Sequence, residues 1–253
     1  MFAEERRKLI LDDLTRTGRV EVATLAQHYA VSEDTIRRDL RELAEQGFLQ
    51  KTHGGAVALD TAHMPWRVRT QLLPEAKTRI GQAAAALVEP HQTVILDAGL
   101  TTLELARHLT ARPLTIVTNS FDIAALFVDD AEVELVLTGG VWNREDRHFS
   151  GPLAEAAIRR YRADWTFLGV CAVHPKAGIT ATYAPDAEVK RSMLECGVKV
   201  VLLADHCKFG QVVSHHVAPL QAIDLLLTDE PTSLLDGLDI TVTVVGKAAV
   251  PAV

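Results

Sequence analysis

Residues 31–57 read VSEDTIRRDLRELAEQGFLQKTHGGAV, and this stretch decides the fold of the first part of the chain. Ser32 is a good helix N-cap, and the two acidic residues after it suit the positive end of a helix dipole. A helix is therefore predicted to begin here, with Ile36, Leu40 and Leu43 as its apolar stripe. One face of this helix is expected to be buried, which leaves the opposite face for solvent or for a partner.

The polar face of this helix carries three arginines. At roughly 100° per residue, Arg38 points directly away from the apolar stripe, with Arg41 nearby and Arg37 to one side. The next residues, FLQKTHGGAVAL, form two short strand-like runs around Gly54 and Gly55, which predicts a β-hairpin.

Two more helices are predicted upstream, over about 3–16 and within 21–30. Three short helices followed by a hairpin are typical of a winged helix-turn-helix domain, whose third helix enters the major groove of DNA. The expected DNA contacts lie on the third helix and the hairpin: Ser32, Thr35, Arg37, Arg38, Arg41, Lys51 and His53. Arginine is the commonest bidentate reader of guanine, whereas Lys51 and His53 suit phosphate or minor-groove contact.

The same pattern has a simpler interpretation. The arginines can belong to an ordinary solvated helix face, with ion pairs such as Arg38 with Glu42 and Arg41 with Glu45. Residues 1–58 are also not basic overall, because acidic side chains slightly outnumber the basic ones. Charge and periodicity alone leave both interpretations open.

A change of pattern follows residues 59–74, which lack a clear period, contain Pro65 and Pro74, and are predicted to be a linker. Seven short, nearly continuous apolar runs then alternate with helical stretches over 101–110, 120–128, 153–161, 184–196 and 231–236. This alternation predicts a larger α/β domain over 75–253 with a mostly parallel sheet. The expected fold is thus a small winged helix-turn-helix domain over 1–58 followed by this α/β domain.

Polar turns follow several of the predicted strands. The turn ILDAGLTTLELARHL places Asp97 and Gly99 before a helix start with Thr101 and Thr102, where backbone N–H groups can hold an anion such as phosphate. Ligands of open α/β sheets bind at the carboxyl ends of the strands. Other predicted turns and basic side chains could converge with this turn on one ligand-binding cleft. They contribute Asn119, Gly139, Gly140, Lys190 and Lys208. A glycine after a strand is, however, more often only a tight turn.

The segment VWNREDRHFSGP, at 141–152, is predicted to be a long polar loop. It can be a lid over a site or an exposed connection, and the residues alone do not decide between these.

Composition narrows the class of protein. The chain has 253 residues, 48% hydrophobic residues and a net charge of -7, so an ordered core is expected and disorder is not. Its three cysteines are too few for a disulfide framework, and neither a signal peptide nor a bilayer-spanning run is present. These features predict a cytoplasmic protein without membrane association.

Residues 31–57 closely resemble the N-terminal signature of the DeoR family of bacterial transcription regulators, with its VS-x-x-TIRRDL helix and HGGA wing. The later segments DAGLTT, VTN, TGG, EVKR and DHCKFG resemble the sensor domain of the same family. The resemblance implies a repressor of carbohydrate or polyol genes that binds double-stranded operator DNA as a homo-oligomer. It also implies a phosphorylated sugar or polyol as effector, and no cofactor. Leu100 departs from the family pattern, because a hydroxyl residue is usual there.

Two other classes of function, an isomerase and a metal or redox sensor, are alternatives to a regulator. A sugar-phosphate isomerase needs carboxylates around the substrate carbons, and Asp97, Glu188 and Asp205 are available. However, the acidic loop that such an enzyme would carry after the predicted strand DWTFLGV is replaced by the apolar and basic CAVHPKAG. A metal or redox sensor could use His206, Cys207, His215 and His216, but no standard zinc spacing is present and neighbours in a strand point to opposite faces. We therefore expect no catalytic residues and no metal site.

Overall fold

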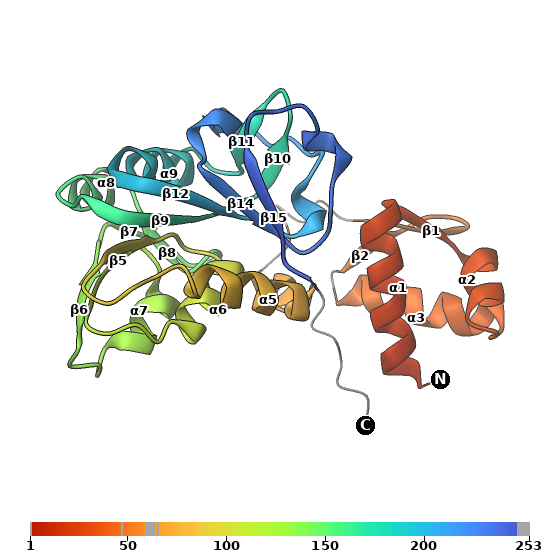
Figure 1. Cartoon of the computed structure of the whole chain (residues 1–253). Helices are drawn as coiled ribbons and strands as arrows, with labels where there is room; N and C mark the ends of the chain where they lie inside the picture. Colours follow the sequence, from red (N-terminus) through yellow and green to blue (C-terminus); the bar gives the residue numbers. More distant parts are fainter. Residues whose placement is uncertain (1, 47, 59–63, 65, 247–253) are drawn as a thin grey trace. The chain divides into compact units, whose positions relative to one another are not determined.

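Figure 1 shows the computed structural model of the chain, which describes residues 2–46, 48–58, 64 and 66–246. The chain divides into two units, Met1–Leu73 and Pro74–Val253. Each unit buries an apolar cluster of its own, so each is described separately.

The first unit is a winged helix-turn-helix domain. Its elements are α1 (Ala3–Thr17), β1 (Arg19–Glu21), α2 (Val22–His28), α3 (Glu33–Glu45), β2 (Leu49–Lys51), β3 (Gly55–Ala58) and α4 (Trp66–Arg69). The predicted three helices and hairpin are confirmed. Strand β1 was not predicted, because three residues carry little pattern and this strand forms only by antiparallel pairing with β3.

The helices of this unit meet through the apolar stripes that the sequence predicted. Ile36 and Leu40 of α3 are buried against Ile10 and Leu14 of α1 and Leu25 of α2. Helix α1 ends at Gly18, which adopts a left-handed conformation with φ 74° and donates its N–H to the carbonyl of Leu14. The polar face of α3 is therefore held outward by burial of its opposite face.

Gly55 is required where β3 of the wing approaches β1. A Cβ added at Gly55 would lie 1.9 Å from the carbonyl oxygen of Val20 in β1. A Cβ at the neighbouring Gly54 would meet nothing within 4 Å. Of the two glycines in the wing sequence, Gly55 is thus the one that the backbone pairing demands.

The segment predicted as a linker is only partly described, since residues 59–63 and 65 lie outside the described part of the chain. Met64 and Val68 are buried in the apolar cluster of the first unit, and Val68 lies on helix α4. This segment therefore contributes a short helix and core side chains, which its lack of periodicity concealed.

The second unit is built on a seven-stranded parallel sheet in the order β15-β14-β12-β9-β4-β5-β6. All seven predicted apolar runs are strands of this sheet: β4 (Thr93–Leu96), β5 (Leu114–Thr118), β6 (Val133–Leu137), β9 (Ala163–Gly169), β12 (Gly197–Leu203), β14 (Leu225–Thr228) and β15 (Thr241–Val244). Because neighbouring strands are parallel, their carboxyl ends share one edge of the sheet.

Helices cover both faces of the sheet (Figure 1). One face carries α5 (Pro74–Ala85), α6 (Leu100–His108) and α7 (Phe121–Phe127), and the other carries α8 (Pro152–Ile158) and α9 (Ala184–Cys196). Helix α5 was not predicted. Short 3-10 turns η1 (His206–Lys208), η2 (Leu220–Ala222) and η3 (Ser233–Leu235) complete the connections, and η3 stands where a helix over 231–236 was expected.

Two small antiparallel sheets were missed by the sequence patterns. The predicted polar loop is a hairpin of β7 (Val141–Asn143) and β8 (His148–Ser150), with His148 and Ser150 buried. Strands β10 (Ala172–His174), β11 (Gly178–Ala181) and β13 (His215–Ala218) form the other sheet. In the part of the chain that the structure describes, no helix combines the length and apolar content that a bilayer crossing demands.

Candidate nucleic-acid interface and effector site

The N-terminus of α3 is closed by hydroxyl groups. The Ser32 Oγ accepts a hydrogen bond of 3.2 Å from the backbone N–H of Thr35. The two hydroxyl oxygens of Ser32 and Thr35 lie 2.8 Å apart. The predicted N-cap is confirmed, and both hydroxyls lie in the first turn of the helix, beside the arginines.

The three arginines of α3 are all exposed, but they differ in their partners. The Arg37 guanidinium pairs with Glu33 at 2.5 Å and with Asp34 at 3.1 Å along the same helix. Arg38 and Arg41 form no ion pair or hydrogen bond with any residue that the structure describes. The predicted solvated ion pair of Arg38 with Glu42 is absent among these residues, because Glu42 pairs with Arg7 of α1.

A buried ion pair fixes the orientation of α3. The Arg6 Nε of α1 donates to the Asp39 Oδ2 at 2.6 Å, and both side chains are less than a tenth exposed. The sequence reasoning missed this pair. A signal was available, since Asp39 lies on the stripe of Ile36, Leu40 and Leu43, and an acidic residue on a buried stripe requires a cationic partner.

The wing exposes the predicted basic groups. Lys51 ends β2, His53 lies in the turn, and both are exposed. The turn closes with the N–H of Thr52 donating to the carbonyl of Gly55 at 3.0 Å. Besides the paired Arg37, helix α3 and this wing thus expose Arg38, Arg41 and Lys51, together with the His53 ring.

In the second unit, the turn after β4 lies at the carboxyl edge of the sheet, beside the central strand β9. Asp97 is completely buried, and its Oδ2 accepts hydrogen bonds from the Lys190 ammonium and, at 3.0 Å, from the N–H of Gly169 at the end of β9. The Asp97 Oδ1 is buried and makes no hydrogen bond with any described residue. Two of the predicted site residues, Asp97 and Lys190, are therefore in direct contact.

Lys190 reaches this turn from α9, where it lies between two carboxylates. Its ammonium contacts Asp97 and lies 3.5 Å from the Asp186 Oδ1, one helical turn away. The side chain is only 4% exposed. A lysine predicted to meet an effector is thus held by the protein's own carboxylates in this structure.

Burial and neighbouring charges shift the pKa values of Asp97 and Lys190 in opposite directions. Burial raises the pKa of the Asp97 carboxyl, and the nearby Lys190 only partly offsets that effect. Burial alone would lower the pKa of Lys190, but the carboxylates of Asp186 and Asp97 outweigh it and raise that pKa above its ordinary value. Lys190 therefore remains an ammonium at every physiological pH.

The predicted hydroxyl and amide contacts also have partners within the protein. Gly99 is the N-cap of α6, and the buried Thr102 hydroxyl donates to the Gly99 carbonyl at 3.0 Å. Thr101 lies beside it in the first turn and is also buried. Asn119 accepts from the N–H of Ala98 at 3.0 Å and donates to the carbonyl of Phe149 at 3.1 Å. Asn119 thus ties the Asp97 turn to β8.

The remaining predicted residues lie along the same edge. Gly139 and Gly140 follow β6 with φ values of 65° and 115°, in the region that favours glycine. A Cβ at Gly140 would lie 2.5 Å from the carbonyl oxygen of Ser150, so the β7–β8 hairpin packs closely here. Lys208 lies in η1, after β12, and is half-buried.

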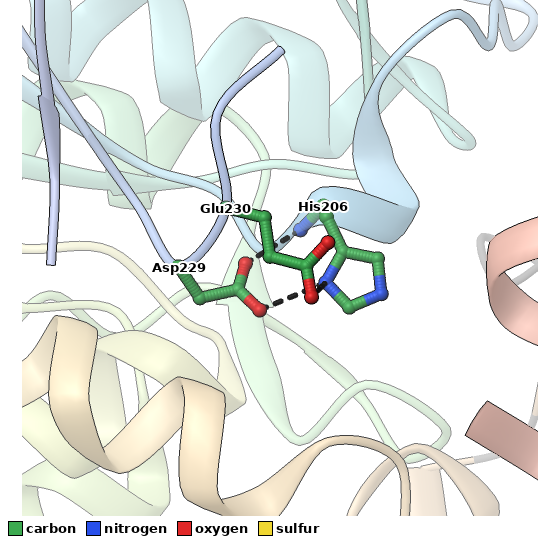
Figure 2. A group of neighbouring side chains, drawn as sticks. All are labelled: His206, Asp229 and Glu230. Carbon is green, nitrogen blue, oxygen red and sulfur yellow. Dashed lines mark hydrogen bonds and ion pairs between the residues drawn. The ribbon is translucent and has the colours of Figure 1, made fainter. Parts of the chain in front are cut away.

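Next to Lys208, His206 forms a pair that the sequence reasoning did not predict. Asp229, which follows β14, accepts twice from His206: Oδ1 from the backbone N–H and Oδ2 from the ring Nδ1, both at 2.8 Å (Figure 2). The Glu230 carboxylate lies 4.0 Å from the same Nδ1. The hydrogen bond that the His206 ring donates to Asp229 raises the pKa of His206, and burial opposes this shift less strongly.

The spacing of these three side chains also bears on metal binding. One ligand atom from each of His206, Asp229 and Glu230 lies within 4.8 Å of the others. Both carboxylate oxygens of Asp229 are already engaged by His206, so hydrogen bonding accounts for the short distances. We therefore assign no metal ligands here. His215 and His216, considered as metal ligands from the sequence, are successive residues of β13 and do not belong to this group.

The three carboxylates considered for an isomerase each have partners within the protein. Asp97 is paired with Lys190, and Glu188 is half exposed and paired with Arg191. Asp205 caps η1 by accepting from the N–H of Cys207 and lies 4.0 Å from the Lys77 ammonium. Cys207 offers no reactive thiolate, since burial raises its pKa well above the ordinary value.

Two family models match the chain and together cover most of it. Residues 6–62 match the DeoR-like helix-turn-helix domain, and residues 73–230 match the DeoR C-terminal sensor domain. The chain belongs to the DeoR family. It is a DNA-binding transcription regulator with a sensor domain, as the resemblance implied, and not an isomerase.

Curated relatives are similar to this DeoR-family chain over nearly their whole length. The HTH-type transcriptional repressor GlcR of Bacillus subtilis is 37% identical over 232 residues, covering 90% of this chain and 89% of that protein. A putative aga operon transcriptional repressor of Escherichia coli O157:H7 is 33% identical over 92% of this chain and 90% of its own length. The L-fucose operon activator of Haemophilus influenzae is 34% identical, covering 92% of this chain and 94% of that protein.

Solved structures resemble this DeoR chain only distantly. Ribose 5-phosphate isomerase A from Methanocaldococcus jannaschii is 16% identical with a TM-score of 0.39, over 54% of each chain. The translation initiation factor eIF-2B from Pyrococcus horikoshii OT3 is 13% identical with a TM-score of 0.47, covering 89% of this chain and 88% of that chain.

Proposed function

We propose that the first unit reads operator DNA with α3 in the major groove and the β2–β3 wing on the backbone. The observation that carries this proposal is that Arg38 and Arg41 are exposed on α3 without an ion pair among the described residues. Unpaired guanidinium groups are free to donate to guanine or to phosphate. Thr35, beside Ser32 in the first turn, lies where recognition-helix side chains reach base edges.

The wing and Arg37 have secondary roles in this proposal. Lys51 and His53 bind phosphate or the minor groove, because they lie on an exposed turn. Arg37 must break its ion pairs with Glu33 and Asp34 before it can bind DNA, so its net contribution to affinity is smaller.

Footprinting on the region upstream of the gene for this protein, with scrambled duplex as competitor, tests the assignment of the DNA-binding surface. Protection of no defined site would refute it.

In the second unit, a phosphorylated sugar or polyol is the proposed effector. Turns with polar groups, after β4, β5, β6 and β12, share the carboxyl edge of the sheet. The start of α6 offers backbone N–H groups to a phosphate, with Thr101 and Thr102 beside it. Asp97, Gly99, Asn119, Gly139, Gly140 and Lys190 shape that site, and Lys208 supplies positive charge.

A thermal-shift screen tests the effector class directly. Phosphorylated sugars and polyols are compared with the same compounds without phosphate. A ligand that binds only the native state stabilises it in proportion to the logarithm of its concentration. Stabilisation by phosphorylated compounds alone is the expected result, and silence from the whole phosphorylated set would contradict the proposal.

The chain is further proposed to repress carbohydrate or polyol genes as a homo-oligomer in the cytoplasm. A single small head offers few base contacts, so two heads on a symmetric oligomer are needed to read repeated half-sites. Light scattering of the free protein and of its DNA complex tests this point. One protomer per specific complex would contradict it. A reporter fused to the protected promoter should rise when the gene is deleted.

A further inference from the structure

We propose that His206 is a contact residue for the effector, whose ring Nε2–H donates to an acceptor oxygen of the ligand only when the imidazole is protonated. The inference deepens the proposed function and rests on it, since it concerns the same edge of the sheet. It adds a residue that was not among the effector contacts expected from the sequence, and a dependence on protonation.

The orientation of the ring is the first argument. Asp229 holds the backbone N–H and the ring Nδ1 of His206 at once, so the side chain is fixed at two points. With Nδ1 turned to the carboxylates, Nε2 is on the opposite side of the ring (Figure 2). No described residue pairs with Nε2, and the side chain keeps 19% of its surface exposed. An oriented, partly open donor without an internal partner is what a ligand contact requires.

Its place in the sheet is the second argument. His206 follows β12, and the anion-holding turn at Asp97 follows β4, with only β9 between these strands. Two steps between neighbouring strands amount to roughly 10 Å, within the span of one phosphorylated sugar. A single effector can therefore place its phosphate at the start of α6 and another oxygen at His206.

Charged groups from several elements surround the ring. Asp229 and Glu230 face Nδ1 from the end of β14, and Asp205 adjoins it at the end of β12. Lys77 of α5 lies near Asp205, and Lys208 belongs to the same 3-10 turn. The carboxylates favour the imidazolium, and the two lysines add positive charge at the edge where an anionic ligand would approach.

Protonation of the His206 ring decides whether its Nε2 attracts or repels an acceptor oxygen of the ligand. With Nδ1–H bonded to Asp229, the neutral ring presents a lone pair at Nε2, which repels an acceptor oxygen. The imidazolium presents an N–H there instead and adds a charge-assisted hydrogen bond. The Asp229 hydrogen bond raises the pKa of His206, so the protonated form persists further above pH 6.5 than in a free histidine.

The test measures ligand affinity by calorimetry at pH 7 and pH 9 with three fixed probes: fructose 6-phosphate, fructose 1,6-bisphosphate and 6-phosphogluconate. A phosphate monoester is already almost fully dianionic across this range, so its own titration adds little. Full-length protein is compared with His206→Gln and with a control, His216→Gln. His216 is exposed on β13 of the same unit. Thermal unfolding of each variant verifies that it folds.

Wild type and His216→Gln should bind the recognised probe roughly tenfold more tightly at pH 7 than at pH 9, and His206→Gln should lose most of this difference. The probe that shows the largest loss identifies which oxygen His206 meets. NMR titration of the wild-type ring should show its pKa rising further on ligand binding, by linkage.

Three results would overturn the inference. Binding with equal pH dependence in all three proteins removes His206 from the site but leaves the proposed function intact. Failure of every phosphorylated compound to bind at either pH removes the proposed function, and the inference with it. Stabilisation by Zn²⁺ that disappears in His206→Gln would assign the group to a metal ion instead of a proton.

Discussion

Arg37 and Arg38 are neighbours in the sequence, but only one of them has partners inside the protein. The Arg37 guanidinium is shared between Glu33 and Asp34, whereas Arg38 pairs with no described residue. An ion pair must be broken before Arg37 can meet DNA, and this cost reduces what it contributes. The two arginines are therefore expected to differ in their effect on operator binding.

Replacing Arg38 with Ala should weaken operator binding by about 1–3 kcal/mol and relax selection at one base position. Arg107→Ala provides the control, because Arg107 is an exposed arginine on α6 of the other unit. Fluorescence anisotropy with a set of single-base operator variants measures both effects. Equal losses on operator and scrambled duplex would show that Arg38 contacts phosphate and does not read a base.

His206 also predicts a pH-dependent contribution to stability. Its folded pKa is raised by Asp229, so the pair stabilises the fold fully below about pH 6.5, the ordinary pKa. This contribution is lost as the pH rises through the raised pKa. The difference in unfolding free energy between wild type and His206→Gln should therefore shrink from pH 6 to pH 9 in denaturant titrations. A difference that grows with pH would contradict the assigned direction.

At the scale of elements, two features hold the DNA-reading surface in place. Helix α3 is anchored to α1 by the buried pair of Arg6 and Asp39, and the wing depends on the close approach of β3 to β1 at Gly55. Both features act on the placement of the contact residues without touching DNA themselves.

Asp39→Ala should destabilise the first unit by about 3–5 kcal/mol, because it leaves the Arg6 charge buried without a partner. Glu42→Ala breaks the more exposed pair with Arg7 and should cost less than about 1 kcal/mol. Hydrogen exchange of amides in α1 and α3 measures the two effects separately from the second unit. Similar costs for both substitutions would mean that Arg6 is solvated after all.

Gly55→Ala should destabilise the wing by about 1–3 kcal/mol, since its Cβ would overlap the Val20 carbonyl. Gly54→Ala is the matched control, with open space around the added methyl group. Operator affinity should fall for Gly55→Ala and change little for Gly54→Ala. The reverse order would place the DNA-contacting backbone at Gly54.

Most elements of the fold could be predicted where their own residues carry the pattern. The seven strands of the parallel sheet are continuous apolar runs, and α3 has both a cap and a stripe. Strands β1, β7 and β10 each have only three residues, too few to show an alternating pattern. Strand β1 in addition forms only by pairing with the distant β3, whereas β7 and β10 pair with the next strand in the chain.

The candidate site shows the same limit. Lys190 and Asp97 were each expected at an effector site, but their pairing joins residues 93 positions apart. The sequence of α9 did carry a pattern that indicates a buried charge, since Asp186, Val189, Lys190 and Met193 occupy one buried stripe of that helix. Two opposite charges on such a stripe indicate a buried ion pair. The partner of His206 could not be predicted, because Asp229 becomes its neighbour only through the β12–β14 pairing.

In the whole molecule, the proposed function joins a DNA-reading unit to a ligand-binding unit. Coupling between them requires that the effector bind one conformation of the protein better than another. The coupling is reciprocal, so a change in operator affinity caused by the effector must equal the change in effector affinity caused by the operator. Unequal factors would show that the protein also populates a bound state or oligomer outside this two-ligand binding scheme.

The most direct test of the central claim is the operator affinity of the full-length protein, measured by anisotropy at fixed moderate salt with and without a phosphorylated compound found in the thermal-shift screen. We predict that the protein prefers its own upstream region over scrambled duplex, and that saturating ligand changes that affinity by roughly fivefold or more. Equal affinity for both duplexes, or an operator affinity that saturating ligand leaves unchanged, would contradict the claim.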